Sequence, residues 1–411
     1  MKIKKSKKSK KYIFSAAIFF FCVVLLSLGV SAGNYNVHNP FDQSPEIYSE
    51  DTTIDIFSEI YDAVNAGGVK ENMPGAAREY LADAGQNSGE LALTDISDSF
   101  SFGFIFNVIM RILGSLISMV VKNFLPIIAF IILGAVIGAL KNLNSGSNFS
   151  DILDFILIIC LAGAVFYNVR ECFYTAQKFL EEIRVYMLTM IPVMASLSTI
   201  SGNAASAATN SAGLYAVLNV VEAVGSGVIL PVLQICFALS LARQLTASLD
   251  TINLSGVSSY IRSVLNWIFI FVMTVLTAVL LFQNILASSA DTVAARTVKF
   301  TVTSFIPVVG GMIGDVSRTI IGSIQAVKSI TGIFGVLVIL ITLLPPLITV
   351  ILNKFMLKIS GAFALILGQE KQAEFMKEMN SLLDITVAIM ISVAVVFIFD
   401  ITLFVRTAVS I

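Results

Sequence analysis

Runs of about twenty apolar residues recur along this chain, and they constrain its fold more than any other feature. A helix of about twenty apolar residues is long enough to cross the hydrocarbon core of a bilayer. Of the 411 residues, 56% are hydrophobic and only 13% are charged, roughly half the charged share of a typical soluble domain. The sequence therefore predicts an all-α polytopic membrane protein with about seven transmembrane helices, in a range of six to eight.

The first 32 residues have the pattern of a signal peptide. Seven lysines between Lys2 and Lys11 precede an apolar stretch over residues 12–29, and small residues follow it. Cleavage is expected between Ala32 and Gly33. An uncleaved anchor is the alternative, because the apolar stretch is long. Either way, the lysines stay in the cytoplasm and residue 33 emerges outside.

Residues 33–100 form an acidic segment with thirteen Asp or Glu residues against Lys70 and Arg78, a net charge of −11. So much like charge disfavours an independent core. We expect a small, partly ordered extracytoplasmic region with two short amphipathic helices, near 53–64 and 76–84. Its acidity fits either a basic partner or ordinary solvated surface.

Beyond residue 100, apolar runs alternate with amphipathic stretches. The clearest expected spans are residues 124–140, 152–167, 268–286, 333–352 and 385–405. The run over 102–121 holds Arg111, so it either lies in the interface or spans. Two charged amphipathic stretches, 170–184 and 370–384, are read as separate helices, the second lying on the membrane surface.

Residues 189–231 are the leading candidate for a functional interior. Pro192, a run of small polar residues, Glu222, two nearby glycines and Pro231 interrupt an otherwise apolar segment. In lipid every backbone N–H needs a partner, so broken or re-entrant helices are tolerated only where protein or water surrounds them. Tight packing through small residues is an equal alternative. The candidate path residues here are Pro192, Asn203, Asn210, Asn219, Glu222, Gly225, Gly227 and Pro231.

Glu222 is the most suggestive of these residues, because charged groups inside spans are costly and usually face a cavity or a partner. The segment 302–313 repeats the interrupted style. It adds the candidates Pro307, Gly310, Gly311, Asp315 and Arg318. The last two residues fit a simple ion pair with each other as well as a path.

An offset of 115 residues aligns landmarks of the two halves without a gap. Ile191-Pro192-Val193 falls on Ile306-Pro307-Val308, and Pro231 falls on Pro346. Chance alignment of apolar segments is the alternative. We therefore divide the membrane part into N-terminal helices at 101–170, repeat unit 1 at 171–286 and repeat unit 2 at 287–411. Transporters are often built from such repeats, with a site where the units meet.

Catalytic and metal-binding motifs are missing from the sequence. None of the four cysteines has CxxC spacing, His38 is the only histidine, and no phosphate-binding glycine loop occurs. We expect no enzyme, no cofactor, no metal and no nucleic-acid partner. The expected surroundings are the lipid bilayer and other proteins, with a homo-oligomer left open.

The order of these features resembles the stage III sporulation protein AE family. The resemblance extends over essentially the whole chain, and it rests most firmly on Lys299–Gly311, with Phe305-Ile306-Pro307-Val308-Val309-Gly310-Gly311, and on the spans that follow. It implies a complex joining mother cell and forespore, with ring-forming subunits between the two membranes and a secretion-type ATPase.

The resemblance further implies a multi-pass, permease-like subunit in the mother-cell membrane around the forespore, with residues 33–100 outside the cytoplasm. It carries over no substrate and no catalytic residue. Three functions stay open at this point: a channel or export-gate subunit of that complex, a stand-alone secondary transporter with a site near Glu222, and a non-conducting membrane scaffold.

Overall fold

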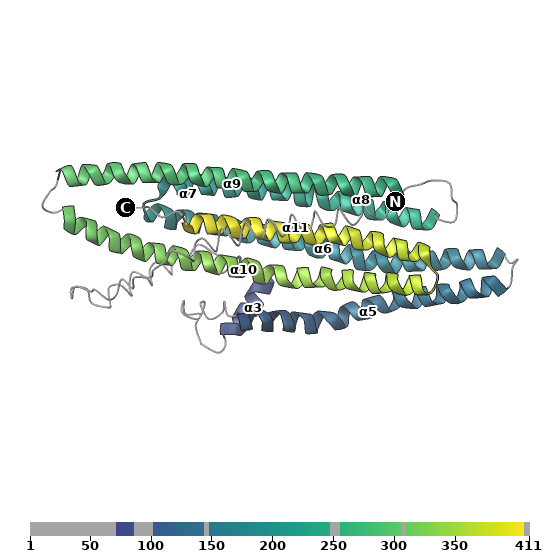
Figure 1. Ribbon diagram of the computed structural model, residues 1–411. Coiled ribbons are helices and arrows are strands. Elements are labelled where there is room, and N and C mark those ends of the chain that lie inside the picture. Colours follow the sequence, from purple (N-terminus) through teal and green to yellow (C-terminus); the bar gives the residue numbers. More distant parts are fainter. Residues whose placement is uncertain (1–70, 86–101, 144–147, 247–254, 306–309, 407–411) are drawn as a thin grey trace.

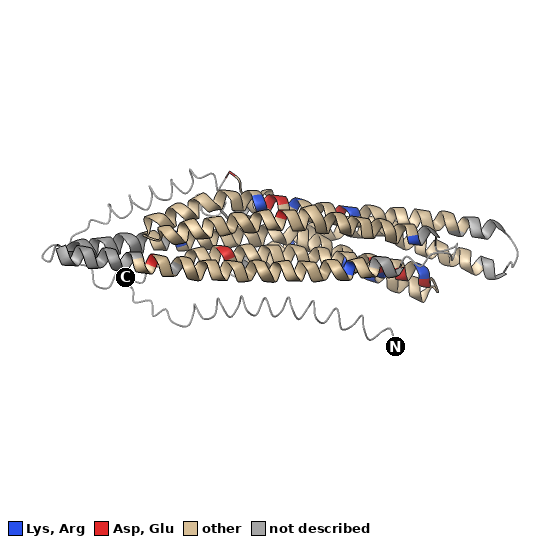
Figure 2. Ribbon diagram, turned by 90° about the horizontal axis from the view of Figure 1, so that it is seen from above, with Lys and Arg blue, Asp and Glu red and all other residues tan. Residues whose placement is uncertain are grey.

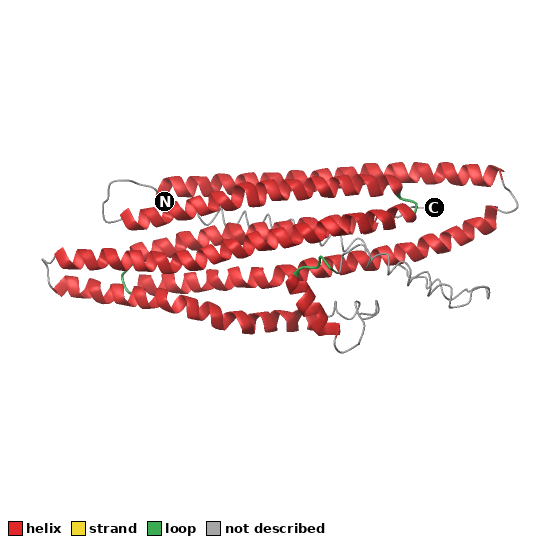
Figure 3. Cartoon of the chain, turned by 180° about the vertical axis from the view of Figure 1, so that it is seen from behind, coloured by secondary structure: helices red, strands yellow, loops and turns green. Residues whose placement is uncertain are grey.

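A computed structural model describes residues 71–85, 102–143, 148–246, 255–305 and 310–406. Within these ranges the chain is helical apart from short turns, as Figure 3 shows. The elements are α3 (Gly75–Gly85), α5 (Phe102–Leu143), α6 (Asn148–Ile200), α7 (Ala204–Val221), the π-helix η2 (Glu222–Ile229), α8 (Leu230–Thr246), α9 (Ser255–Phe305), α10 (Gly310–Ile366) and α11 (Glu370–Arg406).

Six helical stretches of the described chain are long and apolar enough to cross a membrane. They are Ile105–Ala139, Phe155–Ile200, Ala204–Arg243, Ser259–Val293, Val327–Ile366 and Glu370–Val405. The prediction of a polytopic all-α membrane protein is confirmed, and the described residues alone contain six candidate spans, the lower end of the expected range. The protein is therefore a multi-pass membrane protein.

The helices lie side by side in one long bundle (Figure 1). Helices α5, α8 and α10 run toward one end, and α6, α9 and α11 run back. We call the end with the α10–α11 turn the Gly368 end, and the end with the α6–α7 turn the Gly202 end. A helix of 57 residues such as α10 is about 85 Å long, so it extends well beyond a hydrocarbon core of about 30 Å.

Apolar packing between the helices forms one large core that contains buried residues from α5 through α11. Phe124, Phe173, Tyr186 and Phe397 are among its largest fully buried side chains. Large apolar side chains also cover the outside of the bundle, for example Trp267 with 66% exposure. An apolar core beneath an apolar surface is what a helical bundle in lipid requires, because lipid and not water meets the surface.

Prolines do not break these helices, which corrects the expectation of a Pro-broken segment at Pro192. Helix α6 continues through Pro192, and α10 continues through Pro345 and Pro346. Such prolines are tolerated in membrane helices because small local adjustments satisfy the freed backbone groups. Helix α6 ends instead at Ile200, just before Gly202. The positive φ of 85° at Gly202 allows the amides of Gly202 and Asn203 to bond back to the carbonyls of Thr199 and Ser198.

The two amphipathic stretches are not separate helices, and the second does not lie apart on a membrane surface. Residues 170–184 form the middle of α6, and residues 370–384 form the first turns of α11. Met376, Met379 and Leu382 are fully buried where α11 packs along α10. A stripe of apolar residues therefore indicated contact with a neighbouring helix rather than with lipid headgroups.

Part of the acidic segment packs onto the bundle. The helix expected near 76–84 is confirmed as α3, which contacts α10. Ala77 is fully buried, and Tyr80 packs against a small cluster formed by Val108, Ile112 and Ile348. The signal peptide with its Ala32–Gly33 cleavage site and the helix near 53–64 lie outside the described residues.

The element boundaries agree with the offset that the sequence suggests. Helix α9 begins at Ser255 and α11 begins at Glu370, which are 115 residues apart. Each follows a stretch that runs from the Gly202 end to the Gly368 end, so the two hairpins α7–η2–α8–α9 and α10–α11 point the same way (Figure 1). The division into repeat units stays a prediction, and units with these bounds would be parallel rather than inverted.

Two glycines, Gly332 of α10 close to α11 and Gly138 of α5 beside open space, predict opposite effects on stability when each is replaced by alanine. A Cβ at Gly332 would overlap Val405 Cγ2, whereas a Cβ at Gly138 meets nothing within 4 Å. We expect Gly138→Ala to raise the free energy of unfolding by roughly 0.5–1 kcal/mol, and Gly332→Ala to lower it by about 1–3 kcal/mol. Thermal unfolding of the purified protein in detergent measures both; a shift of equal sign would contradict the packing.

Candidate functional site

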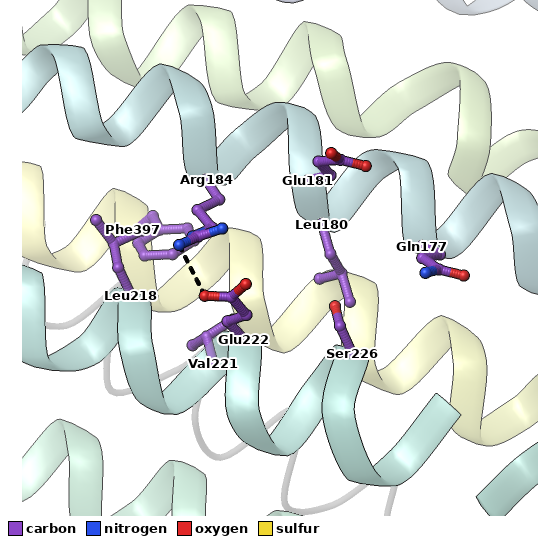
Figure 4. A pocket seen from close by; sticks show the side chains of 9 residues that line it. All are labelled: Gln177, Leu180, Glu181, Arg184, Leu218, Val221, Glu222, Ser226 and Phe397. Carbon is purple, nitrogen blue, oxygen red and sulfur yellow. Dashed lines mark ion pairs between the residues drawn. The ribbon is translucent and has the colours of Figure 1, made fainter. Parts of the chain in front are cut away.

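An ion pair joins α6 to the start of the π-helix. Arg184 Nη2 lies 2.8 Å from Glu222 Oε2, and the two side chains are 38% and 44% exposed. Arg184 projects from the middle of α6, and Glu222 is the first residue of η2 (Figure 4). The residue that the sequence singled out therefore has a basic partner from a different helix.

The ion pair lines an open pocket of about 220 Å³ between α6, α7, η2 and α11. Polar side chains gather on the α6 side and at η2, and apolar side chains form the rest of the wall (Figure 4). The lining residues are Gln177, Leu180, Glu181, Arg184, Leu218, Val221, Glu222, Ser226 and Phe397. With Arg184, Glu181 and Glu222 ionised, the pocket carries one net negative charge.

The π-helix creates the position of Glu222. The Leu230 amide donates to the carbonyl of Gly225, five residues earlier, instead of the usual four. This wider turn rotates the residues before it relative to those after it, and single π segments inside α-helices are frequent at functional sites. The sequence break at Gly225 and Gly227 is thus a change of helix type, and the helical span continues through it.

The pair lies level with the middle of the longest charge-free interval in any one helix. That interval is residues 263–290 of α9. Gly213 of α7 packs against the Gln283 side chain of the antiparallel α9. Glu222 lies nine residues further along, so it is level with about residue 274 of α9. Figure 2 shows long uncharged stretches of helix between groups of charged residues.

A charge at the centre of a span costs roughly 2.5–3.5 kcal/mol on insertion scales. Pairing offsets part of this cost for Arg184 and Glu222, but both side chains remain partly exposed to the pocket. A charged pair at this depth is therefore expensive for the fold, which is the usual mark of a polar pathway or of a contact with another protein.

A second polar group lies at the Gly202 end. Asp291 of α9 is 5% exposed, and its two carboxylate oxygens accept the amides of Ala205 and Ser206 at 2.9 and 2.8 Å. The carboxylate thus caps the N-terminus of α7 from a different helix, since Asn203 at the N-cap position makes no side-chain cap. The buried Lys328 of α10 interacts electrostatically with the same carboxylate.

The single interior predicted for residues 189–231 is therefore two separate places. Glu222 and Gly225 belong to the π-helix beside the pocket, while Asn203 and Asn210 are buried near the α6–α7 turn and at α7. The exposed residues of the set do not line the pocket; they are Pro192, Asn219, Gly227 and Pro231.

The candidates from the second interrupted segment add nothing to the pocket. Pro307 lies outside the described residues. Gly310 and Gly311 form the first turn of α10, and Asp315 and Arg318 follow along the same helix. These four lie toward the Gly202 end, away from the described pocket, and the ion pair expected between the last two is not tested.

Sequence reasoning missed Arg184, Asp291 and Lys328. Arg184 ends the charged stretch 170–184, which the sequence predicts as a separate amphipathic helix, so nothing in the pattern pairs it with Glu222. Asp291 and Lys328 mark the ends of the charge-free intervals on α9 and α10. A search for opposite charges at matching depths of neighbouring spans would have found all three.

The fold and the site together define a class of protein. The chain is a multi-pass helical membrane protein with a charged pair in a pocket between its helices, and its described residues hold no cluster of His, Cys, Asp and Glu suited to a metal ion. The sequence profile described as "Stage III sporulation protein AE" matches residues 90–408. The chain belongs to this sporulation family, which confirms the resemblance.

A curated relative carries the same description. Stage III sporulation protein AE of Bacillus subtilis (strain 168) is 25% identical over 193 residues, which cover 47% of this chain and 48% of the relative. The match therefore spans about half the length of that protein. No solved structure matches the chain.

Removal of the Asp291 cap has a predictable effect. Asp291→Ala leaves the buried amide of Ser206 and the part-buried amide of Ala205 without acceptors. It also removes the carboxylate that faces Lys328, so we expect the free energy of unfolding to fall by about 1–3 kcal/mol. Ser289→Ala, two residues away on an exposed face, is the matched control. Thermal unfolding in detergent compares them, and equal midpoints would show that the cap does not stabilise the fold.

Proposed function

We propose that this chain is a permease-like membrane subunit of a sporulation channel or secretion complex that links mother cell and forespore and is needed for spore development. In this proposal it lies in the mother-cell membrane around the forespore, with residues 33–100 in the intermembrane space. Its partners are ring-forming subunits and a secretion-type ATPase. The family and the multi-pass fold support the proposal.

The observation that carries the conducting role is the Arg184–Glu222 pair in its pocket at half depth. A polar solute crossing the bilayer needs groups that replace its water. Glu181, Gln177 and Ser226 line the same pocket and provide such groups. The net negative charge favours cationic or zwitterionic groups over anions, and Glu222 at the edge of a π-helix is placed where a small change of helix register would move it.

Two alternatives have specific support. The parallel hairpins and the pocket between helices also fit a stand-alone secondary transporter. The packing of α3 onto α10 instead fits a scaffold that holds the exported segment in a fixed position. The experiments below distinguish these functions from a subunit that conducts only within the complex.

The carboxylate of Glu222 is tested by Glu222→Gln, by Arg184→Gln and by the double variant, with Glu370→Gln on the exposed start of α11 as control. If conduction needs the carboxylate, forespore gene expression falls in Glu222→Gln and in the double variant, while co-purification with the ring-forming subunits is unchanged. A stand-alone transporter would keep its transport activity in vesicles that lack the partners.

Recovery in the double variant has a different meaning. If the pair only stabilises the fold, removing both charges together relieves the unpaired charge that each single variant leaves, so activity and yield return. Full activity of Glu222→Gln alone would remove the conducting role from this site and favour the scaffold. The Glu370→Gln chain is expected to behave as the unmodified chain throughout.

The role of the exported segment is tested by deleting residues 33–70. This deletion keeps α3, whose Ala77 is buried against the bundle, so the membrane part should fold as before. If the acidic segment contacts the ring-forming subunits, their co-purification is lost while the thermal midpoint in detergent is unchanged. Normal recovery of the partners would exclude a docking role for these residues.

A further inference from the structure

One face of α6 carries charged and polar side chains that point out of the bundle. Its line of exposed or half-exposed residues repeats every three or four positions and consists of Tyr167, Arg170, Tyr174, Gln177 and Glu181. Glu171 and Lys178 flank the line and are also exposed. We call this set the α6 face. Its spacing of three, four, three and four residues is that of a coiled-coil seam.

The α6 face lies at membrane depth. Arg184 is level with the middle of the charge-free interval of α9, and Glu181, Lys178 and Arg170 lie about 4, 9 and 21 Å from it toward the Gly368 end. The first two of these are inside a hydrocarbon core that extends about 15 Å on each side of its middle, and Arg170 lies about 6 Å outside it, at the level of the headgroups. Charged groups inside the core, such as Lys178 and Glu181, normally face protein or water and not lipid.

Few contacts within the chain compensate these charges. Lys178 pairs with Glu182 at 3.7 Å on the same helix. Among the described residues, Arg170, Glu171 and Glu181 form no ion pair. The α6 face therefore needs a partner that supplies charges of both signs at matching depths.

A second copy of this chain supplies them. Two copies in one membrane share their orientation, so a two-fold axis along the bilayer normal places the two α6 helices parallel, with equal residues facing each other. Arg170 then lies within one helical turn of the second copy's Glu171, and Lys178 lies within one turn of the second copy's Glu181. The pair Arg170 and Glu171 and the pair Lys178 and Glu181 thus each find the opposite charge on the second copy.

We propose that two copies of this chain pair through the α6 face. Tyr167, Tyr174 and Gln177 face their equals in the seam, while Arg170 and Glu181, also in the seam, pair with Glu171 and Lys178 of the second copy. This pairing covers the side of the pocket formed by Gln177 and Glu181, so the open pocket becomes an enclosed space between two copies. The proposal rests on the membrane position of α6 and does not depend on a conducting role for Glu222.

Disulfide cross-linking of the full chain in native membranes tests this pairing. The background replaces Cys22 and Cys160 by serine and keeps the buried Cys172 and Cys236. Single cysteines are introduced by Tyr174→Cys and Gln177→Cys on the α6 face, and by Val275→Cys on the exposed face of α9 as control. Mild oxidation is expected to shift most of the first two chains to twice the monomer mass and to leave the control monomeric.

The charges are tested in the same assay. In the Tyr174→Cys chain, Lys178→Glu is expected to reduce the amount of cross-linked dimer, because it adds a third acidic side chain beside Glu181 and Glu182 in each copy. A further Glu181→Lys substitution is expected to restore the dimer, because it again places a basic and an acidic side chain opposite each other. Loss of dimer in both, with unchanged monomer yield, would contradict the charge pairing.

Three results would overturn the proposal. Equal cross-linking of Val275→Cys would indicate random collision. No dimer from either α6 variant, with a monomeric subunit count by single-molecule photobleaching, would exclude a second copy. A photo-reactive group at Tyr174 that links only to another protein would show that a different membrane protein covers the α6 face.

Discussion

The structure depends on one constraint: inside a bilayer, each backbone amide must find its acceptor within the protein. This explains why the described spans stay helical through Pro192, Pro345 and Pro346, and why the glycine-rich segment after Glu222 widens to a π-helix without opening. At the two turns between helices that the structure describes in full, the carbonyls at the helix end are satisfied locally. At Gly202 and at Gly368 a positive φ closes the same type of cap.

The class of the fold could be predicted because composition and apolar runs are local properties of the sequence. The continuity of the helices could not be predicted in the same way. Proline and glycine disfavour helices in water, whereas in lipid an opened helix would leave further backbone groups without partners. The stretches 170–184 and 370–384 illustrate the same limit. Their amphipathic pattern shows that one side is apolar, but it does not reveal whether a headgroup layer or another helix covers that side.

The candidate site was predicted in part for a related reason. Glu222 is conspicuous on its own, since an acid in an apolar run is costly wherever it lies. Its partner Arg184 comes from a helix 38 residues earlier, and only the relative depth of the two helices brings them together. The role of Asp291 is harder still to predict. A single carboxylate at the end of a span is typical of solvated surface, and only the fold places the first amides of α7 beside it.

Polar contacts at both ends of the bundle hold the two parallel hairpins together. At the Gly202 end, Asp291 joins α9 to α7 and faces Lys328 of α10. At the Gly368 end, Arg243 of α8 contacts Glu374 at 3.3 Å and also pairs with Glu378, both on α11. The Arg184–Glu222 pocket lies between these two contacts. A motion that separates the hairpins at either end must therefore break the polar contact at that end.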